Sequence, residues 1–134
     1  VVRLGIPVMG HIGFTPQYYK KFKVQGLLKK DCFKLVEEAK KNEEAGVFSI
    51  VLECVSNNTA KKIKKSLKIP TIGIGASVNC DGQILVTDDM LGLSGFYPRF
   101  VKKFASLNNI IEKGIQKYNK AVLTKKFPSK KNTF

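Results

Sequence analysis

The chain has 134 residues, which is enough for one domain or part of one, and its hydrophobic share of 43% is typical of a globular protein. The formal charge of +14 is almost all lysine, because Arg3 and Arg99 are the only arginines, and this argues against recognition of nucleic acid. No apolar stretch approaches the roughly 18 residues that span a bilayer, and the three cysteines lack zinc-site spacing.

Four short apolar runs rich in β-branched residues predict strands over residues 5–10, 47–52, 71–76 and 84–87. Apolar positions at helical spacing predict a helix over residues 28–39, with Gly46 as its end signal. A second helix is expected to have Asn57 or Asn58 as its N-cap and to turn Ala60, Ile63 and Leu67 inward. Helical crossovers between successive strands indicate a parallel sheet.

After Gly95 the pattern becomes helical, with one apolar face over residues 100–107 and a second over 111–122. Pro128 is expected to end regular structure. The chain begins with Val1 and no methionine, so we expect a fragment or a processed product.

Two side chains stand near the predicted ends of neighbouring strands. His11 follows the first predicted strand and lies among glycines, and Glu53 ends the second apolar run. Since parallel strands end at the same edge of a sheet, we expect both side chains to point into one cavity. A neutral imidazole can hydrogen-bond an anionic oxygen, and a partly buried carboxylate suits proton transfer. The alternatives are a structural histidine and a salt bridge from Glu53 to a lysine.

The third strand ends in small residues, Gly75-Ala76-Ser77, whose backbone N–H groups are open to a carboxylate. Glycines at this place are also compatible with simple close packing. Asp88 and Asp89 could hold a cation, but consecutive strand residues point to opposite faces. Capping of the following turn, or pairing with a lysine, is the alternative for Asp89.

Several motifs occur here in a characteristic order, and together they cover almost the whole chain. They are residues 5–17, 23–26, 44–46, 51–55, 69–76, 80–86, 91–93, 98–103 and 127–128. The sequence GHIGFTPQ, followed by IGIGA and CDGQ, is the specific part of the pattern. In this order the motifs resemble the C-terminal half of the ketopantoate hydroxymethyltransferase family.

The resemblance implies an α/β fold, a (βα)8 TIM barrel. This chain would supply its second half: about four parallel strands in residues 1–97, and C-terminal helices with a basic tail in residues 98–134. It implies transfer of a hydroxymethyl group from 5,10-methylenetetrahydrofolate to 3-methyl-2-oxobutanoate, with Mg²⁺. The product would be 2-dehydropantoate, a precursor of pantothenate and coenzyme A. A homo-oligomer in the cytoplasm is expected, with an organelle as the alternative location.

By family position, Glu53 resembles the catalytic base and His11 the histidine that contacts the keto acid. Backbone around Ala76, Ser77 and Val78 would approach the substrate carboxylate. The family's metal ligands and substrate-binding lysine belong to the N-terminal half, so no metal ligand is expected in this chain. Residues 1–134 alone are therefore expected to be inactive.

The chain departs from the family pattern at several positions. Ser77 replaces a usual glycine, Asp88 replaces a usual histidine, and Lys131-Asn132 replaces a usual Glu-His pair.

Two other functions compete with this reading. One is a Mg²⁺-dependent barrel enzyme of the phosphoenolpyruvate/pyruvate type, which would form an enolate from a keto acid without folate. The other is a non-catalytic lysine-rich binding module that uses the tail at residues 125–131. The scarcity of arginine and the buried-strand pattern argue against the module.

Overall fold

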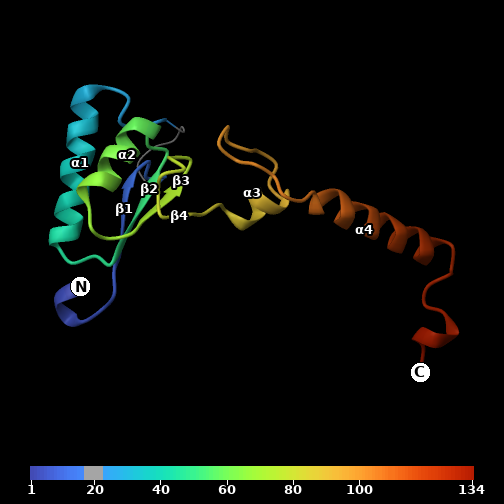
Figure 1. Ribbon diagram of the computed structural model, residues 1–134. Coiled ribbons are helices and arrows are strands. Elements are labelled where there is room, and N and C mark those ends of the chain that lie inside the picture. Colours follow the sequence, from blue (N-terminus) through green and yellow to red (C-terminus); the bar gives the residue numbers. More distant parts are fainter. Residues whose placement is uncertain (17–22) are drawn as a thin grey trace. The chain divides into compact units, whose positions relative to one another are not determined.

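The computed structural model describes residues 1–16 and 23–134. Gln17, the last residue of the first sequence motif, lies outside the described residues. The chain forms two compact units, residues Val1–Leu85 and Val86–Phe134 (Figure 1). The sequence-based division after residue 97 stays a prediction.

The first unit is a four-stranded, fully parallel sheet in the order β1-β2-β3-β4. The strands are β1 (Met9–Gly13), β2 (Ser49–Glu53), β3 (Thr71–Ile74) and β4 (Gly82–Gln83). A short 3-10 turn, η1 (Val2–Leu4), precedes them. The helices α1 (Lys29–Glu44) and α2 (Asn57–Ser66) connect β1 to β2 and β2 to β3 (Figure 1). The predicted parallel α/β architecture is thereby confirmed.

One face of the sheet packs on α1 and α2, and this contact forms the hydrophobic core. The buried cluster comprises Ile12, Leu35, Ala39, Ile50, Leu52, Val55, Ala60, Ile63, Leu67 and Cys80. Each fully buried aliphatic side chain of this kind stabilises the fold by about 1.5–3 kcal/mol. Cys32 is also buried, on the inner side of α1, as its helical position predicts.

None of the helices described in the first unit, residues 1–16 and 23–85, covers the opposite face of the sheet. The side chains of Met9 and His11 are exposed there, and Val51 and Ile72 are half-buried. The two faces differ in burial because successive side chains of a strand point to opposite faces of the sheet. Ile12, Ile50 and Leu52, which alternate with the residues above, lie on the face that the helices cover. The uncovered face therefore combines apolar side chains with the two polar groups singled out in the sequence.

Several predicted boundaries in this unit are wrong. The second strand is Ser49–Glu53 rather than 47–52, and the third ends at Ile74 rather than at residue 76. The first strand begins at Met9, so His11 lies within it rather than after it. The fourth strand is Gly82–Gln83, not 84–87, because the Thr-Asp-Asp sequence at residue 87 begins a helix. The N-cap of α2 is Ser56, whose hydroxyl accepts a hydrogen bond from the N–H of Thr59, rather than an asparagine.

The turn between β3 and β4 is fixed by Asp81. Its carboxylate accepts hydrogen bonds from the N–H and the hydroxyl of Thr71, at 2.8 and 3.0 Å. The ammonium of Lys64 on α2 lies 2.6 Å from the second carboxylate oxygen. The Lys64 hydrogen bond, with help from the Thr71 backbone, holds the pKa of Asp81 at about 2, below its ordinary value of 3.8.

We expect Asp81→Asn to lower the free energy of unfolding by about 1 kcal/mol at neutral pH. The whole pKa shift would correspond to about 2.4 kcal/mol, but the side chain is 39% exposed, so solvent screens much of it. Because the folded-state pKa is depressed, the stabilisation is present above pH 3.8 and disappears as the pH falls towards 2. Urea unfolding of both proteins across this range measures the difference, with Glu37→Gln as an exposed control. A difference that persists near pH 2 would contradict this explanation.

The second unit contains α3 (Thr87–Leu91), α4 (Leu107–Leu123) and the 3-10 turn η2 (Lys130–Asn132). The helix predicted over 111–122 is confirmed within α4, but the one predicted over 100–107 is wrong. The N–H of Phe104 donates to the carbonyl of Met90 instead of to a helical partner. Among the described residues, no helix has the length and apolarity needed to cross a membrane.

Candidate active site

The side chains of His11 and Glu53 are in direct contact on the uncovered face of the sheet. His11 is in register with Val51, and Gly13 is in register with Glu53, so the two polar side chains lie diagonally across neighbouring parallel strands. His11 Nε2 is 3.1 Å from Glu53 Oε2. The side chain of His11 is 36% exposed and that of Glu53 is 15% exposed. The pair is therefore open to solvent through the imidazole, and Glu53 pairs with His11 rather than with a lysine.

Two glycines allow β1 to bring His11 to this place. A Cβ at Gly10 would lie 2.9 Å from Asn42 Oδ1 of α1, so a larger residue there would require the side chain of Asn42 to move. Gly13 has a φ of +101°, and a Cβ there would lie 2.2 Å from the carbonyl oxygen of Glu53. The N–H of Phe14 donates to that same carbonyl at 2.8 Å. The glycine pattern around His11 thus holds the end of β1 against Glu53.

Cys54 follows Glu53 and is excluded as a nucleophile at neutral pH. It is buried, and its backbone is left-handed with a φ of 51°. Burial, and secondarily the charge of Glu53, raises the pKa of the thiol from 9.0 to about 11. The N–H of Cys54 donates to the carbonyl of Ile74 at the end of β3, so this residue ties the two strand ends together.

The connection from β3 to β4 lies at the same edge of the sheet, since Glu53 is in register with Ile74. Within the described residues, the N–H groups of Ala76, Ser77 and Val78 donate no hydrogen bond to the protein. Gly75 turns the chain here with a φ of +60°. Three unpaired N–H groups after a strand end can receive an anionic oxygen, as the sequence pattern suggested.

The described residues do not fit a Mg²⁺ site. Residues 1–16 and 23–134 contain no cluster of three histidine, cysteine or acidic side chains that could hold a metal ion. His11 and Glu53 are a pair without a third ligand. Asp88 and Asp89 lie in the first turn of α3, where Asp89 accepts a hydrogen bond from Ser94.

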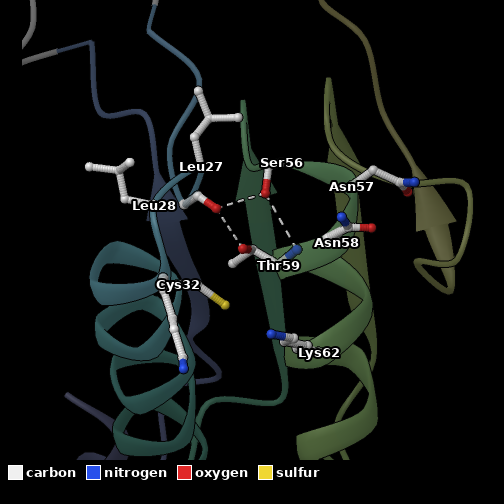
Figure 2. A pocket seen from close by; sticks show the side chains of 10 residues that line it. Leu27, Leu28, Cys32, Ser56, Asn57, Asn58, Thr59 and Lys62 are labelled. Carbon is white, nitrogen blue, oxygen red and sulfur yellow. Dashed lines mark hydrogen bonds between the residues drawn. The ribbon is translucent and has the colours of Figure 1, made fainter.

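A pocket of about 420 Å³ lies between the first turns of α1 and α2 (Figure 2). Hydrogen bonds at its edge link the loop before α1 to α2, because the hydroxyls of Ser56 and Thr59 donate to the carbonyl of Gly26 at 2.9 and 2.7 Å. Residue spacing does not predict this contact between Gly26 and the start of α2. Its only trace in the sequence is the run of four hydrogen-bonding side chains from Ser56 to Thr59.

Comparison with known proteins covers the whole chain. The family described as ketopantoate hydroxymethyltransferase matches residues 1–130. Proteins named 3-methyl-2-oxobutanoate hydroxymethyltransferase match all of the chain in Clostridium botulinum (52% identity), Pelagibacter ubique (47%) and Bdellovibrio bacteriovorus (49%). The chain spans about half the length of these relatives, 50% to 52%. Its parallel α/β sheet agrees with part of the expected (βα)8 barrel, and the chain belongs to the ketopantoate hydroxymethyltransferase family.

Proposed function

We propose that these residues serve as the second half of an enzyme that transfers a one-carbon unit from 5,10-methylenetetrahydrofolate to 3-methyl-2-oxobutanoate. The product is 2-dehydropantoate, and water supplies its new hydroxyl oxygen. The observation that carries the proposal is the contact between His11 and Glu53 at 3.1 Å, on the face of the sheet that α1 and α2 leave open. The names of relatives that match the whole chain support the same reaction.

Glu53 acts as the base in this proposal. Its carboxylate takes the proton from the carbon next to the keto group and leaves an enolate. Water breaks the two C–N bonds of the methylene bridge, which releases tetrahydrofolate and a one-carbon unit at the oxidation level of formaldehyde. The enolate adds to this carbon, and the alkoxide that forms takes the proton back from Glu53 to give the new hydroxyl. His11 hydrogen-bonds the keto acid through its exposed imidazole and keeps the Glu53 carboxylate in place through Nε2. The half-buried position of Glu53 keeps bulk water away from the proton that it moves.

The keto acid is oriented by its carboxylate in this proposal. The unpaired N–H groups of Ala76, Ser77 and Val78 donate hydrogen bonds to the carboxylate oxygens, at the edge of the sheet where Glu53 ends β2. Mg²⁺, which the family resemblance implies, would be held by residues outside this chain. The working enzyme is a homo-oligomer in this proposal, with no nucleic acid or membrane partner.

The test is an assay of the complete product of the gene that encodes this chain. Mixed with both substrates and Mg²⁺, it is expected to release tetrahydrofolate and 2-dehydropantoate in equal amounts, which absorbance and mass spectrometry measure. Residues 1–134 alone are expected to release neither. Consumption of the keto acid without folate would favour an enolate-forming enzyme of the phosphoenolpyruvate/pyruvate type, and no turnover would overturn the proposal.

A further inference from the structure

Three polar side chains join the β3–β4 connection to the start of α2, and we call Asn57, Ser77 and Asn79 the loop clamp. Ser77 is 5% exposed, and its hydroxyl donates to Asn57 Oδ1 at 2.6 Å. The hydroxyl oxygen of Ser77 also accepts a hydrogen bond from the N–H of Asn79 at 3.2 Å and another from Nδ2 of Asn79 at 3.0 Å. The amide of Gln83 donates to the carbonyl of Ser77 at 2.8 Å. The hydroxyl of Ser77 therefore has its full set of partners inside the protein.

Asn57 can take part in the clamp because it is not needed as a helix cap. Ser56 caps α2, which leaves the neighbouring amide side chain free to reach another loop. Figure 2 shows the side chain of Asn57 turned away from Leu27 and Leu28, on the side of α2 where the β3–β4 segment passes. Ser56 and Thr59 meanwhile bind the carbonyl of Gly26. Three loops at one edge of the sheet thus form a single hydrogen-bonded unit.

We propose that Asn57 and Ser77 are positioning residues for the carboxylate of the keto acid. This inference rests on the proposed function and adds a role that the family match does not assign. The saturated hydroxyl of Ser77 has no hydrogen left to donate to a substrate, so its effect passes through the backbone. By fixing the side chain of Ser77 to α2, the clamp sets the direction of the N–H groups of residues 76–78.

The test compares Asn57→Ala and Ser77→Ala in the complete gene product. Because the N–H groups bind the carboxylate in both the ground and transition states, each variant is expected to raise KM for the keto acid about ten-fold, with kcat changed less than about two-fold. Ser77→Thr keeps the hydroxyl that donates to Asn57 and adds no charge beside the bound carboxylate, so it is expected to leave KM within about three-fold of wild type. Asn58→Ala is the matched control, since Asn58 is exposed and has no side-chain hydrogen bond among the described residues.

The double variant provides an independent check. If both residues act in one clamp, combining the two alanines should raise KM no further than either alone. Equal KM values for wild type and Asn57→Ala, in an enzyme that turns over, would overturn the clamp alone. A lower melting temperature with unchanged KM would assign the residues to stability and overturn it too. A wild-type protein that neither turns over nor binds the keto acid, by calorimetry, overturns the proposed function and the clamp together.

Discussion

Replacing Glu53 by glutamine should lower kcat of the complete gene product about 1,000-fold, because the substitution removes the proton acceptor and keeps the shape of the side chain. The glutamine oxygen can still accept a hydrogen bond from Nε2 of His11, so the fold and the substrate site should persist. Steady-state kinetics measures the loss. Exchange of the proton beside the keto group with deuterium, followed by NMR without folate, should slow to the same degree.

The control for this substitution is Glu37→Gln. Glu37 is exposed on α1, and its side chain makes no ion pair or hydrogen bond among the described residues. Its replacement should therefore leave kcat within about two-fold of wild type. A Glu53→Gln enzyme that keeps more than about a tenth of wild-type kcat would show that another group moves the proton.

Gly13→Ala should be the most destabilising single-methyl change at the site. Gly13 is left-handed, and its new Cβ would meet the carbonyl oxygen of Glu53 at 2.2 Å and Val55 Cγ2 at 2.8 Å. Since one of these contacts is backbone, either β1 or the end of β2 must shift. We expect the free energy of unfolding to fall by about 3 kcal/mol or more, and kcat/KM to fall with it as Glu53 moves.

Gly5→Ala separates backbone strain from the clash. Gly5 is also left-handed, with a φ of +76°, but a Cβ there meets no atom within 4 Å. Its substitution should cost about 1 kcal/mol and leave activity unchanged. Urea unfolding and kinetics of both variants give the comparison. If Gly13→Ala costs no more than Gly5→Ala, the close approach of β1 to Glu53 is not what requires a glycine.

The sequence predicted the elements that depend on periodic burial. The parallel sheet, α1, α2 and the buried positions of Ala60 and Ile63 follow from spacing, because side-chain burial repeats with the geometry of the element. The failed helix over 100–107 had the same spacing, but Phe104 N–H bonds to Met90 instead. The spacing of four apolar positions does not determine whether a backbone N–H bonds to a carbonyl within a helix or to one in a distant segment.

The candidate site was predicted in part. The sequence predicted that His11 and Glu53 lie together, and the structure places them 3.1 Å apart, although His11 lies within β1 rather than after its end. The clamp could not be predicted in this way. Asn57 and Ser77 are 20 positions apart, and their contact depends on Ser56 taking the cap, which sequence spacing did not decide.

The sheet of the first unit has two outer strands, and β1 and β4 each have a single neighbour among the described residues. Outer strands with free backbone groups attract strands from other molecules. The charge of +14 opposes this attraction between copies of the chain, but added electrolyte weakens such repulsion. This polypeptide should therefore resist aggregation best when it is purified and stored in buffer of low ionic strength.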